Sequence, residues 1–132
     1  MIFVDTGAWF AASIPRSEHH SAARDWLSGL TESLITSDYI VDETLTLMRA
    51  RNEPDQSLSF GRQMFAEELC SIEYLSADDV LAAWRVFERY ADKGWSFTDC
   101  TSKVLMERLG IKTAFAFDQH FRQFGSVEVV PG

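Results

Sequence analysis

The chain has 132 residues, of which 46% are hydrophobic and 24% are charged. This composition is typical of a globular protein and excludes a disordered or fibrous one. The formal net charge is −8, which argues against a broadly basic, phosphate-binding surface. The first residues show no basic n-region, and no apolar run is long enough for a signal peptide or a membrane span.

The two cysteines indicate a reducing compartment. Cys70 and Cys100 lie in apolar contexts, which suits buried and reduced thiols. No Cys/His spacing resembles a zinc site. We therefore expect a single cytoplasmic domain over residues 1–132, with no membrane contact.

The predicted elements alternate between strands and helices along the whole chain. Short apolar runs predict five strands, at residues 2–4, 33–36, 70–75, 113–117 and 127–130. Helical spacing and capping signals predict helices at residues 8–12, 18–30, 38–51, 54–69 and 76–90, and from Ser96 or Thr98 to Gly110. Among the helix starts, Asp38 and Ser76 are the predicted caps, and Pro54 occupies a first-turn position.

This alternation predicts the fold class. Parallel neighbours need crossover connections, so the pattern implies an α/β fold with a parallel sheet and helices on both faces. Crossovers are right-handed almost without exception. Every strand therefore ends at the same edge of the sheet, and every following helix begins there.

Four acids are predicted to lie at this edge. Asp5 and Asp118 directly follow two of the apolar strands, Asp99 lies in the first turn of a helix, and Glu43 lies near the start of another. Open α/β sheets bind their ligands at this edge. The sequence does not establish that the four side chains converge within it.

Each acid taken alone also has a structural interpretation. Asp5 and Asp118 suit helix caps, and Asp99 suits the positive end of a helix dipole. Glu43 is harder to explain in this way, because it shares a helix face with the apolar Ile40 and Leu47. A carboxylate there is partly desolvated and requires a cation or a hydrogen-bond donor.

If the four acids converge, they need a cation. Two unit charges about 4 Å apart repel by roughly 4 kcal/mol at an effective dielectric near 20. Mg²⁺ or Mn²⁺ is the natural counterion, because both prefer oxygen ligands. Such a metal activates water and stabilises charge on a phosphodiester.

Other polar residues are assigned supporting roles. The hydroxyls of Thr6 and Thr98 are candidate donors to the neighbouring acids, although plain capping is favoured. Lys103 and Arg122 are the best candidates for phosphate contact. The histidines are interpreted as surface residues, although His120, two residues after Asp118, could touch substrate. Arg49, Arg51 and Arg62 could bind an RNA backbone, but a solvated helix face is the favoured interpretation.

Four segments resemble the motifs of a known family. Residues 4–9 (VDTGAW), 42–45 (DETL), 96–100 (SFTDC) and 116–121 (AFDQHF) resemble, in order and spacing, the four motifs of PIN domains and especially of VapC-type toxins. Any one motif is weak, but all four in order are fairly specific. The resemblance spans the chain and shows no departure from the four-acid pattern.

The resemblance implies a five-stranded parallel sheet in the order 3-2-1-4-5. It implies an Mg²⁺- or Mn²⁺-dependent endoribonuclease in which Asp5, Glu43, Asp99 and Asp118 hold the metal. It further implies a homodimer and an antitoxin protein that occludes the site, often with a basic side chain. The acidic net charge suits such a partner better than it suits RNA.

Two other function classes share a parallel α/β fold, but the motifs that they need are missing from this sequence. A receiver-like signalling domain needs a paired acid after the first strand, but Thr6 follows Asp5. A haloacid-dehalogenase-like phosphatase needs a second aspartate two positions after the first, where this chain has Gly7. A catalytically silent module of the same fold, binding a basic peptide through its acidic pocket, stays open.

Overall fold

The structure, a computed structural model that describes residues 1–132, is built on a five-stranded sheet. Every neighbouring pair of strands is parallel, and the order is β3-β2-β1-β4-β5. This confirms the predicted fold class and strand order. The strands are β1 (Ile2–Val4), β2 (Leu34–Ser37), β3 (Ser71–Glu73), β4 (Thr113–Phe115) and β5 (Glu128–Val130).

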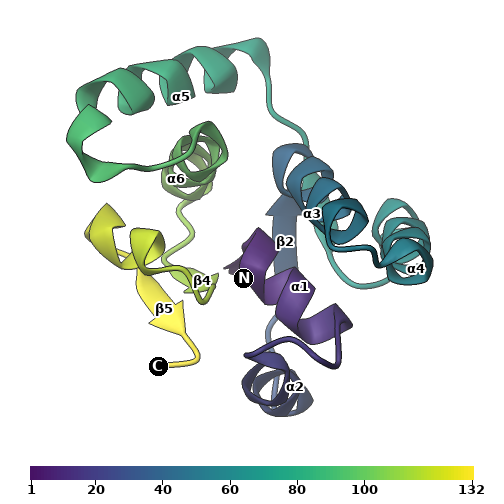
Figure 1. Ribbon diagram of the computed structural model, residues 1–132. Helices are drawn as coiled ribbons and strands as arrows, with labels where there is room; N and C mark the ends of the chain where they lie inside the picture. The colour runs from purple at the N-terminus through teal and green to yellow at the C-terminus, as the bar shows by residue number, and fades with distance from the viewer.

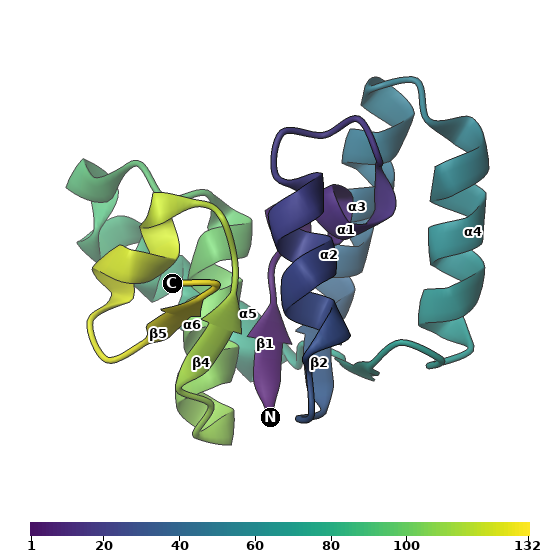
Figure 2. The same cartoon turned by 90° about the horizontal axis from the view of Figure 1, so that it is seen from below.

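Helices cover both faces of this sheet. In Figure 2, α2 passes in front of β1 and β2, whereas α5 and α6 lie behind the sheet; Figure 1 shows α3 and α4 together at one side. No helix has the length and apolarity to cross a membrane. The α-helices are α1 (Thr6–Ser13), α2 (His20–Ser28), α3 (Asp38–Ala50), α4 (Pro54–Phe65), α5 (Ala77–Arg89) and α6 (Phe97–Leu109), and two short 3₁₀ helices are η1 (Ala91–Lys93) and η2 (Gln119–Phe124).

The hydrophobic core lies around the central strands. Phe3 and Val4 of β1 and Phe115 of β4 are fully buried. A parallel sheet covered on both faces buries both sides of its strands, which explains the uninterrupted apolar runs at these positions. The two free cysteines are buried in the same core, as predicted.

Several predicted element ends differ from the structure. The strand predicted at 70–75 pairs only over Ser71–Glu73, because its partner β2 offers a three-residue register. The helix predicted to reach Leu69 ends at Phe65, and Glu67 adopts the left-handed region with φ +52°. The strand predicted at 113–117 stops at Phe115. Hydrophobic runs thus overestimated the paired lengths.

Helix starts were predicted with mixed success. The predicted cap Asp38 is wrong: Ser37 caps α3 by accepting a hydrogen bond from the Ile40 N–H at 3.1 Å. Asp38 is instead the first helical residue, and its Oδ1 accepts from the Leu75 N–H at 3.0 Å. Ser76 is confirmed as the cap of α5, within a capping box, and Gly110 as the stop of α6, with φ +68°.

The sheet order places a topological switch point between β1 and β4. The chain moves from β1 to β2 on one side, whereas β4 joins β1 on the other. The Asp5 N–H donates to the Phe115 carbonyl at 3.0 Å, which fixes Asp5 at this point. Ligands of open α/β sheets bind outside the carboxyl ends of the strands at such a position.

An ion-pair network joins α5 to the end of α6. Arg108 donates to both carboxylate oxygens of the buried Asp79 at 2.9 Å and to Glu73 at 3.0 Å. Burial alone would raise the pKa of Asp79, but hydrogen bonds from Ser76 and Arg108 outweigh burial and lower it. This network holds the helix whose first turn carries Asp99.

Replacing Arg108 tests whether this ion-pair network stabilises the fold. We expect Arg108→Met to lower the free energy of unfolding by about 1–3 kcal/mol, because Asp79 stays buried without its charged partner. Urea denaturation measures the change. Arg85→Met, an exposed residue of α5, is the control and should change stability by less than about 0.5 kcal/mol. Equal losses in the two variants would contradict the role of the network.

Candidate active site

Asp5 is a buried carboxylate at the end of β1. The residue is 5% exposed, and its side chain makes no capping hydrogen bond to α1. Helix capping was the structural role that the sequence suggested for Asp5, but its side chain does not cap α1. Burial, and next the charge of Asp99, raise the pKa of Asp5 to about 8, against the opposing effect of the Thr6 N–H.

The other predicted acids surround the same carboxylate. Besides Asp99, the charges of Glu43 and Asp118 also raise the pKa of Asp5. Three acids thus lie close enough to affect the charge of Asp5. The four residues come from the end of β1, from α3, from α6 and from the segment after β4. The parallel topology brings them to one edge of the sheet.

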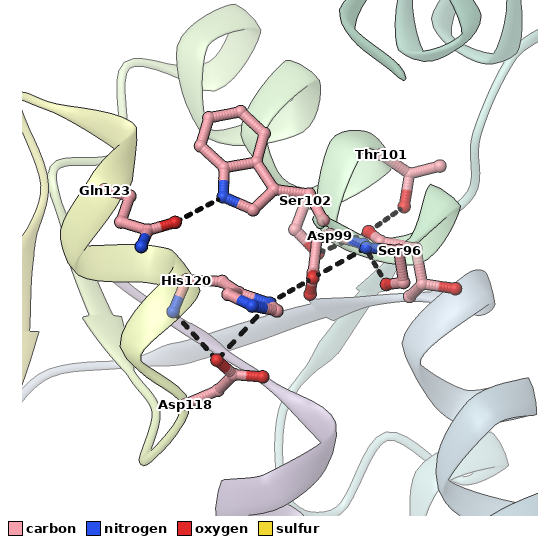
Figure 3. A network of polar contacts seen from close by, with 9 residues as sticks. Ser96, Asp99, Thr101, Ser102, Asp118, His120 and Gln123 are labelled. Atoms are coloured by element: carbon pink, nitrogen blue, oxygen red, sulfur yellow. Dashed lines mark hydrogen bonds and ion pairs between the residues drawn. The ribbon is translucent and has the colours of Figure 1, made fainter. Parts of the chain in front are cut away.

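Asp99 has both a structural and a site role. Its Oδ2 accepts from the Ser96 N–H at 3.0 Å, and its own N–H donates to Ser96 Oγ at 3.0 Å, which forms a capping box at the start of α6. The same Oδ2 lies 2.8 Å from His120 Nδ1, as Figure 3 shows. Asp99 Oδ1 has no hydrogen-bond partner and is available to a ligand.

His120 belongs to this cluster, and its interpretation as a surface residue was wrong. Its Nδ1 lies between two carboxylates, 2.8 Å from Asp99 Oδ2 and 3.4 Å from Asp118 Oδ1 (Figure 3). Its backbone N–H also donates to Asp118 Oδ1 at 2.8 Å. The 3₁₀ turn η2 folds His120 back over Asp118. The sequence offered only the two-residue separation from Asp118 as a signal.

Asp99, Asp118 and His120 bring three potential metal-ligand atoms close together. One ligand atom from each of Asp99, Asp118 and His120 lies within 4.8 Å of the other two. Asp118 supplies the more open side of the group, with 42% of its side chain exposed, whereas the Asp99 side chain is 10% exposed. The half-buried Glu43 makes no ion pair or hydrogen bond.

The two threonines are placed differently. Thr6 is buried and follows Asp5 in sequence, and its Oγ1 is the one buried side-chain polar atom without a hydrogen-bond partner. Thr98 uses its backbone carbonyl to accept from Thr101 Oγ1 at 2.6 Å and from Ser102 Oγ at 3.1 Å. Thr6 Oγ1 therefore makes none of the hydrogen bonds to the neighbouring acid that the sequence suggested.

The two basic residues predicted to contact phosphate, Lys103 and Arg122, make no ion pair with the acid cluster. Lys103 is largely buried, and its ammonium pairs with Glu107, one turn further from Asp99 along α6. Arg122 is exposed on η2 and makes no ion pair. Their contact with phosphate stays a prediction.

The donor set fits a hard divalent cation. Potential ligand atoms of Asp99, Asp118 and His120 lie within 4.8 Å of one another, and burial together with the neighbouring acids raises the pKa of Asp5. The fold and the site therefore define a parallel α/β protein with a carboxylate cluster that could hold a metal ion at its switch point.

Comparisons with known proteins identify the family. The PIN domain profile matches residues 2–127. The chain is 31% identical over 131 residues, 99% of both proteins, to the Mycobacterium tuberculosis 23S rRNA-specific endonuclease VapC20. It is 30% identical over 124 residues to an Archaeoglobus fulgidus VapC ribonuclease, which covers 89% of this chain and 77% of that protein. The chain belongs to the PIN-domain family, in its VapC-type branch.

Two solved structures have the same fold as this chain. The crystal structure of VapC20, described as a sarcin–ricin loop cleaving toxin, matches with a TM-score of 0.91 at 29% identity, over 98% of both chains. FitAcB from Neisseria gonorrhoeae matches with a TM-score of 0.69 at 17% identity, over 98% of this chain and 96% of that chain, which shows the shared fold.

The raised pKa of Asp5 predicts a pH-dependent stability of the metal-free protein. The unfolded chain loses this proton above about pH 4, whereas the folded chain keeps it to about pH 8. Stability from this group therefore falls as pH rises from about 4 to about 8. We expect Asp5→Asn to flatten that fall and to raise Tm at pH 8 by several degrees.

Thermal unfolding in EDTA across this pH range measures the effect. Asp92→Asn, an exposed acid of η1, is the control and should keep the wild-type pH slope. A slope identical in wild type and Asp5→Asn would contradict a raised pKa at Asp5.

Proposed function

We propose that this chain is a metal-dependent endoribonuclease that hydrolyses RNA phosphodiester bonds and acts as the toxin of a toxin–antitoxin pair. The observation that carries the proposal is the cluster at the switch-point edge, where potential ligand atoms of Asp99, Asp118 and His120 lie within 4.8 Å of one another. The buried Asp5 belongs to the same edge, because the charge of Asp99 contributes, after burial, to its raised pKa. Relatives named as ribonucleases, which match nearly the whole chain, support the same reaction.

Within this proposal, Asp5, Glu43, Asp99 and Asp118 hold Mg²⁺ or Mn²⁺. A bound divalent ion would activate a water molecule and stabilise charge on the phosphodiester. Asp99 Oδ1 is the free oxygen of a carboxylate whose orientation the capping box fixes. His120 acts as a positioning residue that orients Asp99 and Asp118, and Thr6 and Thr98 stay candidate supporting residues next in sequence to Asp5 and Asp99.

Ribosomal RNA is the substrate we propose. VapC20 is named as specific for 23S rRNA and is described as cleaving the sarcin–ricin loop. The near-complete coverage and the TM-score of 0.91 support a similar substrate for this chain. Sequence-specific RNA recognition mostly uses unpaired loops, whose bases can leave the stack. Action on such an RNA places the enzyme in the cytoplasm.

Two protein partners complete the proposal. A cognate antitoxin with a basic segment would complement the acidic edge and the net charge of −8. A homodimer would cover apolar side chains that α5 leaves in solvent, namely Leu81 at 54%, Trp84 at 49% and Phe87 at 39% exposure. Exposed aromatic groups of this kind are typical of protein interfaces.

Cleavage of RNA by the purified protein tests the proposed reaction. We expect a sarcin–ricin loop RNA to be cleaved with Mg²⁺ or Mn²⁺ and to stay intact in EDTA. Asp99→Asn should lower the rate by on the order of a hundredfold or more, since metal-held charge stabilisation amounts to several kcal/mol. The asparagine still accepts the Ser96 hydrogen bond, so the helix start is kept.

Asp78→Asn, an exposed first-turn residue of α5, is the matched control and should cleave like wild type. Full activity of a folded Asp99→Asn protein would contradict the site. No cleavage of any RNA by folded protein freed of its partner, under any metal condition, would favour the catalytically silent module that binds a basic peptide.

His120 provides a separate prediction. We expect His120→Ala to weaken Mn²⁺ binding and to lower the cleavage rate by about 10–100-fold, the usual cost of losing a group that orients metal ligands. His120→Asn should recover much of both, because its amide nitrogen can reach Asp99 from a position like that of Nδ1. Calorimetry and cleavage assays measure the two effects. A rate loss with unchanged Mn²⁺ affinity would contradict the positioning role.

A further inference from the structure

A groove of about 480 Å³ lies beside the acid cluster. It is enclosed by α1, by the segment between α1 and α2, and by the second half of α3; Figure 2 shows that segment arching from α1 to α2. The residues that matter most for its chemistry are Gly7, Phe10, His19, Leu47, Arg51 and Phe117.

Three residues that line the groove are close in sequence to the candidate metal-binding acids. Gly7 follows Asp5 by two residues, and Phe117 directly precedes Asp118. Along α3, Leu47 lies one turn beyond Glu43, on the same helix face. A ligand in the groove would therefore lie along α1 and the second half of α3, on elements that also carry or adjoin the candidate acids.

A flat aromatic surface forms one wall of the groove. The His19 ring stacks on Phe117 with centroids 4.5 Å apart and an interplanar angle of 2°. The His19 side chain is 47% exposed, which leaves room for a further ring to stack against it. Unpaired nucleobases stack on aromatic side chains of this kind whatever their sequence.

Arg51 lies at the end of the groove that is farther from the acids along α3. The Arg51 guanidinium carbon lies 5.9 Å from the Phe10 ring centroid, and Arg51 makes no ion pair. Two turns of α3 separate it from Glu43, about 12 Å along the helix axis. The other charged groups of the groove largely offset one another: Arg16 pairs with Glu53, and Glu18 lies 3.9 Å from His19 with most of its side chain in solvent.

We propose that this groove binds the ribonucleotide next to the scissile phosphate, with its base stacked on His19 and a phosphate held by Arg51. The inference rests on the proposed ribonuclease function and adds a substrate-binding site to it. An isolated guanidinium beside a flat ring suits the phosphate and base of one nucleotide. It also explains how a protein of net charge −8 holds RNA next to four acids.

Nucleotide binding tests the groove without any catalysis. We would titrate the wild-type protein in EDTA with each of the four nucleoside 5′-monophosphates, and with inorganic phosphate, and follow backbone amide resonances. The proposal predicts shifts at Gly7, His19, Arg51 and Phe117 with the nucleotides, and weaker shifts near Arg51 alone with phosphate. Shifts confined to other surfaces would overturn it.

Matched variants separate the two contacts. Arg51→Gln and His19→Ala should each weaken binding of a short single-stranded RNA by about tenfold, the scale of one lost stacking or phosphate contact. His19→Phe keeps a flat ring and should retain the wild-type affinity. Arg49→Gln, on the same helix but outside the groove, is the charge-matched control.

Salt dependence identifies the phosphate contact. In Arg51→Gln the slope of log affinity against log salt should fall by about 0.7, the value for one phosphate on a single strand. His19→Ala should leave that slope unchanged. An equal loss of slope in Arg51→Gln and Arg49→Gln would show general charge attraction and would overturn the assignment of Arg51.

Cleavage kinetics keep this proposal distinct from the proposed function. If the protein cleaves RNA, Arg51→Gln and His19→Ala should raise KM about tenfold, with kcat changed less than KM. If nucleotides bind the groove and no RNA is cleaved, the ribonuclease function fails and the groove stands. If RNA is cleaved with unchanged KM in both variants, the groove proposal fails and a protein segment becomes its expected occupant.

Discussion

Repulsion among carboxylates gathered at one sheet edge is the constraint on which the rest of this structure depends. At Asp5, burial raises the pKa to about 8, and the charges of Asp99, Glu43 and Asp118 add to the effect of burial. A backbone hydrogen bond from the Asp5 N–H to the Phe115 carbonyl fixes the main chain of Asp5 at this edge. The edge is stable as a scaffold and short of positive charge, which is the condition for binding a divalent ion.

Much of this arrangement could be predicted from the sequence. Uninterrupted apolar runs followed by Asp5 and Asp118 identified strands that end in acids, and the alternation with helices implied that parallel strands bring those ends together. The strand order 3-2-1-4-5 came from the family resemblance rather than from periodicity. Element ends were predicted less well, because the paired length of a short strand depends on its neighbour, as β3 on β2 shows.

The missed features are those that depend on tertiary contact. His120 looked like a surface residue because its only sequence signal is its separation from Asp118; the turn of η2 brings its ring against Asp99, which is 21 residues away in sequence. Arg51 looked like part of a solvated helix face, and only the packing of α1 against α3 places it in a groove. Both residues therefore gain their roles from tertiary packing: His120 through its contacts with Asp99 and Asp118, and Arg51 through its place in the groove lined by α1 and α3.

Calorimetric titration of Mn²⁺ at pH 7, in two buffers of different ionisation enthalpy, tests the central claim most directly. If the acids form one site in which Asp5 holds a proton until a cation arrives, each bound ion should release about one proton from wild type and close to none from Asp5→Asn. Binding without proton release in wild type, or with equal release in both proteins, would contradict a metal centre built on a buried Asp5.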